Sequence, residues 1–370
     1  MKYGFFAFIF AFLLTMIVYT IVKGWQVLTP VGSLKTVYAV LMVLLFTAFL
    51  TGMIFGNSFS PGVAKTVSFI GYSFLVLLVY LLISFLLTDI IRLINRFVPF
   101  INNMPDFRLW VFGISLAVIA VMMIIGNYKF NRPQTVYLEI ESSKPLQHKE
   151  IKIVAVSDLH LGISIDKHRL RKYVSMINAQ QPDIVLIAGD LIDRSILPVV
   201  NQKMDEELRQ IKAPLGVFGI NGNHEFFGEG AKQIIDFYRK SNIVLLQDSS
   251  ALVNNEFYII GRDDKINVHR KTLNEITAGL DHSKPGILLD HQPSNLEDAE
   301  KNNIDLQLSG HTHNGQFFPG NLIVKSMFEL GYGYLKKGNT HYYVSSGLAL
   351  WGPQYRIGSQ SEMVVIKFKY

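Results

Sequence analysis

Residues 151–160 read Ile-Lys-Ile-Val-Ala-Val-Ser-Asp-Leu-His, an apolar run that ends on two side chains able to bind a metal ion. Short runs rich in Ile and Val are typical of strands buried in a sheet. Carboxylate oxygen and neutral imidazole nitrogen are ligands for hard and borderline divalent metals. The segment therefore predicts a strand at residues 151–157 with candidate ligands, Asp158 and His160, just after its end.

Four later segments repeat this arrangement of polar residues after an apolar run. They are Gly-Asp-Leu-Ile-Asp at 189–193, Gly-Asn-His-Glu at 222–225, Asp-His at 290–291 and Gly-His-Thr-His at 310–313. Together with residues 158–160 they contain five of the ten histidines. Each motif alone is weak, because Gly-Asp and Gly-Asn pairs occur more often in turns than in metal sites. As an ordered series, they predict a site for two metal ions.

The sequence from residue 151 onwards alternates short apolar runs with stretches of helical periodicity. The apolar runs are 151–157, 183–188, 216–220, 243–246, 257–260, 286–289, 305–308, 341–345 and 363–368, and the helical stretches are 168–178, 205–211 and 230–240. Such alternation predicts an α/β domain. Because α/β sheets carry their sites at the carboxyl ends of strands, we expect the candidate ligands to meet on one rim.

The first 126 residues are much poorer in charge than the rest of the chain. They hold seven of the 35 Lys and Arg and two of the 29 Asp and Glu. Four apolar stretches reach the length of about 20 residues that a helix needs to cross a bilayer; these are residues 4–22, 34–55, 66–88 and 109–126. The first is read as a span and not a signal peptide, because it is long and no Ala-x-Ala-like cleavage site follows. We expect an all-α four-span transmembrane region at 1–126, a linker with a strand that leads into the next domain at 127–150, and the α/β domain at 151–370.

Residues 89–108, between the third and fourth spans, leave two interpretations open. Arg92 and Arg96 lie four apart among apolar side chains, which fits a short helix in the membrane interface. The alternative is an extension of the third span.

The net charge of +6 comes mainly from the apolar region, which contributes +5. The remaining residues are nearly neutral, so direct binding of nucleic acid is disfavoured. The chain has no cysteine. A disulfide framework and a thiolate metal site are therefore excluded.

The ordered motif series resembles that of the calcineurin-like metallophosphoesterase superfamily over about residues 150–370. The end of the chain narrows the resemblance through residues 310–316, Ser345-Ser346-Gly347, Arg356-Ile357-Gly358 and Glu362. These are similar to a bacterial membrane-associated branch that includes enzymes like UDP-2,3-diacylglucosamine diphosphatase, although Asn314 stands where Gly is common. The resemblance implies a β-sandwich flanked by helices (αββα) and a metal-dependent phosphoric ester or diphosphate hydrolase.

The resemblance also implies a ligand set for two divalent ions. One ion would be held by Asp158, His160, Asp190 and His313, and the second by Asp190, Asn223, His291 and His311. Mixed ligation by Asp, Asn and His suits Mn, Fe or Zn better than Mg. A water or hydroxide between two such ions has a lowered pKa and attacks phosphorus at neutral pH.

Four further residues near the motifs receive expected roles. In the family pattern His224 is the general acid, a task that suits its ordinary pKa of about 6.5. Asp193 and Glu225 either support the site or are turn and cap residues. Arg356 either contacts phosphate with its forked donors or forms a surface ion pair.

The nature of the substrate depends on two aromatic pairs beside the motifs. Phe226-Phe227 and Phe317-Phe318 either form an apolar wall for an acyl chain or lie in the core. The four spans favour a substrate that resides in the bilayer. We therefore expect cleavage of a phosphodiester or pyrophosphate bond in a phospholipid or lipid-linked phosphate.

Two alternatives stay open. One is a membrane-tethered phosphodiesterase or phosphatase that acts on soluble nucleotides. The other is a catalytically silent ligand-binding or scaffold protein, which would have lost ligands, whereas every expected ligand is present. We expect an integral protein of the bacterial cytoplasmic membrane. The basic residues flanking the spans divide four against five, so the side of the catalytic domain is undecided, and the sequence does not specify an oligomeric state.

Overall fold

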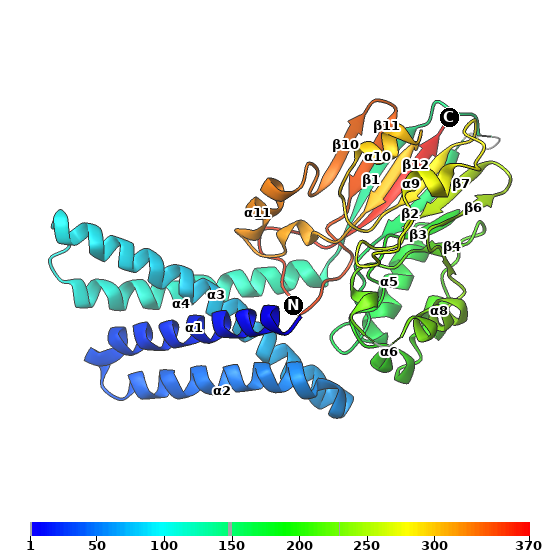
Figure 1. The fold of residues 1–370 in the computed structure, drawn as a ribbon. Coiled ribbons are helices and arrows are strands. Elements are labelled where there is room, and N and C mark those ends of the chain that lie inside the picture. Colours follow the sequence, from blue (N-terminus) through cyan, green and yellow to red (C-terminus); the bar gives the residue numbers. More distant parts are fainter. Residues whose placement is uncertain (1, 147–149, 229) are drawn as a thin grey trace. The chain divides into compact units, whose positions relative to one another are not determined.

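The computed structural model describes residues 2–146, 150–228 and 230–370 and divides the chain into two compact units (Figure 1). One unit comprises Met1–Gly126 with Gly352–Gln354, and the other comprises Asn127–Trp351 with Tyr355–Tyr370.

The first unit is built from long apolar helices. They are α1 (Lys2–Leu28), α2 (Leu34–Phe55), α3 (Pro61–Phe97) and α4 (Met104–Asn131), with short 3-10 turns η1 (Thr29–Val31) and η2 (Gly56–Ser58) between them. All four helices are long and apolar enough to cross a membrane, which confirms the four-helix prediction. Residues 89–97 continue α3 without a break, so that part of the connection is an extension of the third helix.

The second unit contains two six-stranded sheets. The first has the order β1-β12-β2-β3-β4-β5 and the second the order β10-β11-β9-β8-β7-β6. The strands of the first sheet are β1 (Gln134–Glu141), β2 (Glu150–Val156), β3 (Ile184–Ile187), β4 (Val217–Gly219), β5 (Val244–Leu245) and β12 (Glu362–Lys369). Those of the second are β6 (Ser249–Val253), β7 (Phe257–Gly261), β8 (Gly286–Leu289), β9 (Leu306–Ser309), β10 (Gly333–Lys337) and β11 (Thr340–Val344).

The two sheets stack face to face and bury the apolar side chains of their inner faces between them. Alternate side chains of each strand point to opposite faces, so each sheet also presents an outer face. Ile153 of β2 packs in one apolar cluster with Ile287 and Leu306 of the second sheet, whereas Val154 faces the other way. Val154 shares its cluster with side chains of α5 (Lys167–Ala179) and α8 (Ala231–Lys240). The outer face of the second sheet packs against α9 (Leu273–Thr277) and α10 (Glu297–Lys301). This confirms the predicted αββα sandwich.

Parallel pairing decides where the loops meet. Strands β2, β3 and β4 are parallel neighbours in the first sheet, and β7, β8 and β9 are parallel neighbours in the second. Within each sheet the carboxyl ends of these strands lie on one edge. The loops that carry the sequence motifs follow β2, β3, β4, β8 and β9.

Some elements were not predicted from the sequence. They are the strands β6 and β10 and the helices α6 (Leu197–Asn201), α9, α10 and α11 (Gly320–Met327). Helix α7 (Met204–Leu208) covers only part of the stretch predicted at 205–211. Strands β6 and β10 are the edges of the second sheet, where one side of the strand needs no partner and an apolar pattern is weak.

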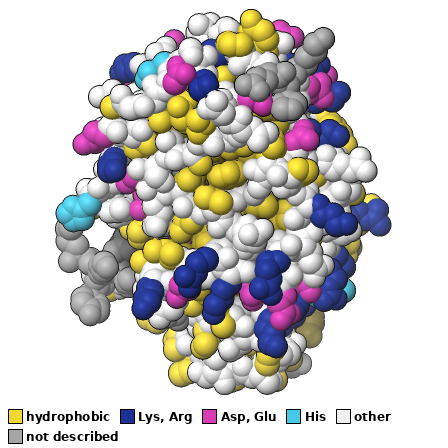
Figure 2. All heavy atoms as spheres, turned by 90° about the vertical axis from the view of Figure 1, so that its right-hand side faces the viewer, with side chains coloured by type: hydrophobic (Ala, Val, Ile, Leu, Met, Phe, Trp, Pro, Cys, Tyr) yellow, Lys and Arg dark blue, Asp and Glu magenta, His cyan; other side chains and the backbone are white. Residues whose placement is uncertain are grey.

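One face of the molecule carries side chains of both charge signs. Figure 2 shows Lys and Arg lying among Asp and Glu on that face, with hydrophobic side chains between them. The charged side chains drawn there are mixed in sign.

Candidate metal centre

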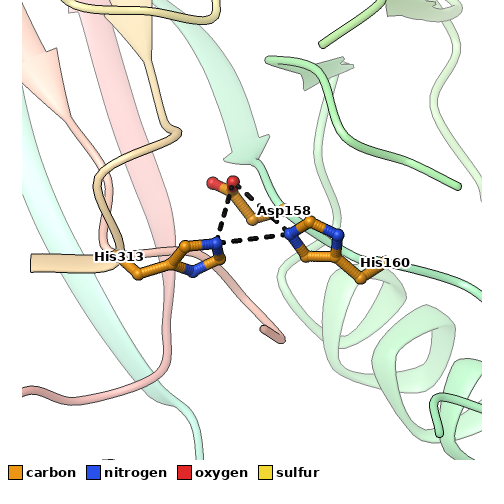
Figure 3. A group of neighbouring side chains, drawn as sticks. All are labelled: Asp158, His160 and His313. Atoms are coloured by element: carbon orange, nitrogen blue, oxygen red, sulfur yellow. Dashed lines mark hydrogen bonds and ion pairs between the residues drawn. The ribbon is translucent and has the colours of Figure 1, made fainter. Parts of the chain in front are cut away.

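Three side chains from distant parts of the chain converge in the second unit. Asp158 and His160 lie in the loop after β2, and His313 begins the short turn η4 (His313–Gly315) after β9 (Figure 3). The Nε2 atoms of His160 and His313 lie 3.3 Å apart, and Asp158 Oδ1 lies 3.8 Å and 3.5 Å from them. Two ring nitrogens and a carboxylate that face one point form a candidate ligand set for a metal ion.

A second group of side chains adjoins the first through Asp190. This residue follows β3, and its Oδ2 lies 3.7 Å from His160 Nε2 and 3.2 Å from His291 Nε2. His311 Nδ1 lies 2.7 Å from Asn223 Oδ1. The structure thus brings together all seven residues predicted as ligands, with Asp190 facing both groups.

The donors present fit divalent metal ions. Each of the groups Asp158–His160–His313 and Asp158–Asp190–His291 has one ligand atom per residue within 4.8 Å of the others. His291 Nδ1 bonds to the carbonyl of Ala188 at 2.8 Å, while its buried Nε2 has no hydrogen-bond partner in the part of the chain described. A buried ring nitrogen without a partner, turned toward a carboxylate, is expected at a metal site.

The backbone at these residues adopts conformations that are uncommon outside glycine. Asp158, His160, Asp190, His311 and His313 have φ of 55°, 46°, 51°, 71° and 51°. Left-handed conformations of non-glycine residues carry strain and concentrate at functional sites. They occur at five of the seven candidate ligands.

Glycines in two motifs leave room for the carboxylates. A Cβ atom on Gly222 would overlap Asp190 Oδ1, and one on Gly310 would overlap Asp158 Oδ2. A larger residue at either position would displace a candidate ligand, which explains why Gly precedes Asn223 and His311.

The local electrostatics keep the carboxylates ionised. Burial alone would raise the pKa of Asp158, but His313, His160 and His291 lower it well below its ordinary value. Burial likewise opposes a lowered pKa of Asp190, yet the nearby His291 and His160 lower it. Two anionic carboxylates therefore lie at the centre of the site.

The histidines differ in their proton affinity. Burial lowers the pKa of His311 to about 4 and that of His313 to about 3, so both rings are neutral at pH 7, the form that binds metals. Burial would also lower the pKa of His291, but Asp190 and Asp158 raise it well above its ordinary value. His291 must therefore lose a proton to act as a ligand.

His224 is placed beside the two groups by its own contacts. Its backbone N–H donates to Asp190 Oδ1 at 2.9 Å. Its Nδ1 lies 2.7 Å from the carbonyl and 3.0 Å from Oδ1 of Asp193. These acceptors place the proton on Nδ1 and hold the ring, so Nε2 is the remaining nitrogen for proton transfer.

The two acidic residues near His224 both support the loops. Asp193 contacts the His224 ring, whereas Glu225 is buried and its carboxylate accepts the backbone N–H of Ile192 at 2.8 Å and of Gly222 at 2.7 Å. Burial, and then the charge of Asp190, raises the pKa of Glu225 to about 7. Glu225 joins the loop after β3 to the loop after β4.

The structure contradicts both roles predicted for Arg356, a contact with phosphate and a surface ion pair. Its side chain is fully buried and therefore neither contacts substrate phosphate nor forms a surface ion pair. It donates to the carbonyls of His313, Ser346, Gly347 and Ala349. Sequence reasoning missed this role because the acceptors are backbone atoms, which leave no motif. Arg356 ties the turn that carries His313 to the loop after β11.

A pocket opens beside the candidate ligands. Besides Asp190, Asn223, His224, His311 and His313, it is lined by Arg194, Phe227 and Trp351. Phe227 and Trp351 are 54% and 43% exposed, and their rings lie 5.4 Å and 6.0 Å from that of His224. Phe227 thus belongs to the pocket and not to the core, and Phe318 of the second aromatic pair is also exposed. The pocket combines metal-binding side chains, one exposed guanidinium and an aromatic wall.

Comparison with known proteins points to one family. A family model described as calcineurin-like phosphoesterase matches residues 151–315. The chain is 34% identical over 266 residues to an uncharacterized metallophosphoesterase of Campylobacter jejuni, and the aligned region covers 70% of this chain and 70% of that protein. It is 32% identical over 260 residues to an uncharacterized metallophosphoesterase of Aquifex aeolicus, covering 67% of this chain and 98% of that protein. It is also 30% identical over 273 residues to a Danio rerio protein named transmembrane protein with metallophosphoesterase domain, covering 69% of this chain and 62% of that protein.

Proposed function

The chain belongs to the calcineurin-like phosphoesterase family of metal-dependent hydrolases, and on that premise we propose that it cleaves a phosphodiester or diphosphate bond in a lipid-linked substrate. In this proposal residues 1–126 anchor the protein in a membrane, 127–150 link the two parts, and 151–370 carry the catalytic centre. The observation that carries the proposal is the pocket in which the candidate ligands adjoin exposed aromatic side chains.

We assign the ligands to two ions in the arrangement that the family resemblance implies. Asp158, His160, Asp190 and His313 hold one ion, and Asp190, Asn223, His291 and His311 hold the other. The short distances among His160, His313 and Asp158 support the first set, and those from Asp190 to His291 and from Asn223 to His311 support the second. When bound, such ions supply Lewis acidity and lower the pKa of a water nucleophile, and Mn, Fe or Zn suits these donors.

His224 supplies the proton for the leaving oxygen. Burial alone would lower the pKa of His224, but the hydrogen bond with Asp193 and the charge of Asp190 raise it above its ordinary value. The ring is therefore protonated over a wider pH range than a free histidine. With Nδ1 held by Asp193, the proton at Nε2 is available to the substrate.

The walls of the pocket suit an amphiphilic phosphate. Arg194 offers a forked cation to a phosphoryl group next to the scissile bond. Phe227 and Trp351 offer an apolar surface to the hydrocarbon close to that group. The same aromatic rings would also stack against a nucleobase, which keeps a soluble nucleotide as the second candidate substrate.

The direct test is hydrolysis by detergent-purified, Mn-loaded, full-length protein. We expect cleavage of bis-p-nitrophenyl phosphate, with loss of activity in Asp190→Asn and His224→Ala. Release of phosphate from a polyprenyl diphosphate and release of the nucleoside monophosphate from a nucleoside diphosphate sugar then separate the two substrate classes. Cleavage of p-nitrophenyl phosphate alone would replace the diesterase by a phosphomonoesterase. Protein that holds metal but cleaves none of these substrates would favour the binding or scaffold alternative.

A further inference from the structure

Helix α11 carries apolar side chains on its outer surface. Leu322, Ile323 and Met327 are 55%, 57% and 69% exposed, and no residue of the helix is buried. At about 100° per residue, these three side chains and Ser326 fall within an arc of about 140°. Phe318, just before the helix, is 49% exposed. We call Phe318, Leu322, Ile323 and Met327 the α11 surface.

The charge of this helix complements an anionic lipid surface. Its sequence, Gly-Asn-Leu-Ile-Val-Lys-Ser-Met, contains one lysine and no acidic residue. Lys325 lies about 60° from Leu322 around the helix axis, at the border of the apolar arc. An apolar face bordered by a cation is typical of helices that lie in a membrane interface, where Lys extends its amine to the headgroups.

The chain connection ties the catalytic domain to a helix of membrane-spanning length. Helix α4 ends at Asn131 and β1 begins at Gln134, so two residues join a helix of membrane-spanning length to the catalytic domain. A connection this short gives the domain a high effective concentration at any bilayer that α4 enters. Contiguous exposed apolar side chains on such a domain indicate an interaction surface. A lipid bilayer is the partner that the tethered, membrane-spanning helices favour.

The α11 surface is also joined to the candidate metal centre. Four residues separate the turn η4, which begins with His313, from the start of α11, and a Cβ on Gly315 would overlap the backbone of Gly320 and Asn321. The side chain of Gln316 donates to the carbonyl of Trp351 at 3.4 Å. The start of α11, a candidate ligand and an aromatic wall of the pocket therefore form one connected structure.

We propose that the α11 surface docks on the boundary between headgroups and acyl chains of an anionic phospholipid bilayer and delivers a lipid from that bilayer to the aromatic wall of the pocket. The delivery rests on the proposed function, whereas the docking does not. Docking depends only on the apolar side chains and on Lys325.

Because the chain has no cysteine, a single introduced cysteine reports on one position. Full-length Ile323→Cys, labelled with an environment-sensitive nitrobenzoxadiazole dye, is reconstituted in phosphatidylcholine vesicles containing about 30% phosphatidylglycerol. Nitroxide-labelled acyl chains should quench the dye at least about twofold if it enters the interface. The matched control is Val268→Cys, an apolar residue of the same domain that is 85% exposed.

The outcomes separate docking from mere proximity and from catalysis. Quenching at position 323 but not at 268 supports docking, and adding Leu322→Glu should remove it. No quenching at 323, or equal quenching at both positions, overturns the proposal. Hydrolysis of bis-p-nitrophenyl phosphate by the same labelled proteins reports on the catalytic centre separately. An active protein without quenching rejects docking alone, and a quenched but inactive protein rejects the proposed function alone.

Discussion

The two sheets of the catalytic domain contribute different chemistry to one site. The loops after β2, β3 and β4 of the first sheet supply both carboxylates, the amide and the imidazole of His160, whereas the loops after β8 and β9 of the second supply imidazoles alone. The first set stays anionic because neighbouring histidines lower the pKa of Asp158 and Asp190. In the second set, burial keeps His311 and His313 neutral.

This division of labour has a structural consequence. In our assignment each ion takes ligands from both sheets, so metal binding would join the two halves of the sandwich at their shared rim. Asp190 is the one ligand that we assign to both ions. Loss of the Asp190 carboxylate on the first sheet should therefore lower metal content and activity more than loss of one imidazole on the second.

The largest effect is expected from Asp190→Asn. Loss of the shared carboxylate charge weakens the binding of both ions, and we expect diester hydrolysis to fall by roughly a thousandfold or more. His313→Ala removes a ligand from one ion only and should retain more metal. Equal metal loss in the two variants, measured by elemental analysis, would argue against a shared ligand.

His224→Ala tests proton transfer without removing a proposed ligand. We expect kcat for the diester to fall by roughly a hundredfold to a thousandfold, because protonation of the leaving oxygen is lost. Metal content should stay at the wild-type level. Substrates with a more acidic leaving group should suffer less, and an effect that is independent of the leaving group would contradict the role of general acid.

Arg356→Lys tests how the second sheet holds its ligand turn. Lysine keeps the charge but loses the fork that reaches the carbonyls of His313 and its neighbours. We expect a loss of roughly 3 kcal/mol of stability from these unpaired buried carbonyls. For a domain of this size, that lowers Tm by roughly 6–12 °C. An unchanged Tm in a thermal scan would show that other contacts fix the turn.

The smallest effect is expected from Asp193→Asn. Asp193 raises the pKa of His224, and a general acid acts only while it is protonated, so activity falls as the pH rises through that pKa. Removing the carboxylate charge lowers this pKa, and the alkaline limb of the profile of kcat against pH should move to lower pH, with about a tenfold loss of kcat. A limb that stays in place would assign Asp193 a purely structural role.

The sequence was sufficient for the fold because its signals are local. Each candidate ligand follows an apolar run such as residues 151–156, and parallel strands bring such positions to one edge. The four apolar helices were predicted for the same reason, whereas the αββα arrangement was implied by the family resemblance.

Other features depend on contacts that no motif records. Arg356 bonds to backbone carbonyls, and the loop of Asp193 meets His224 across 31 residues of sequence. The exposure of Leu322 and Ile323 could not be foreseen, since apolar residues at helical spacing usually face a core. Strand β10 was missed because it is a polar edge strand that begins at a glycine.

The central claim is a dinuclear metal centre organised around Asp190. Elemental analysis of purified full-length protein, after loading with Mn and removal of free metal, tests it most directly. We predict two ions per wild-type chain and fewer than one in Asp190→Asn, with diester hydrolysis rising as the second ion binds. Wild-type protein that retains no metal, or an Asp190→Asn variant that retains two ions, would contradict the account.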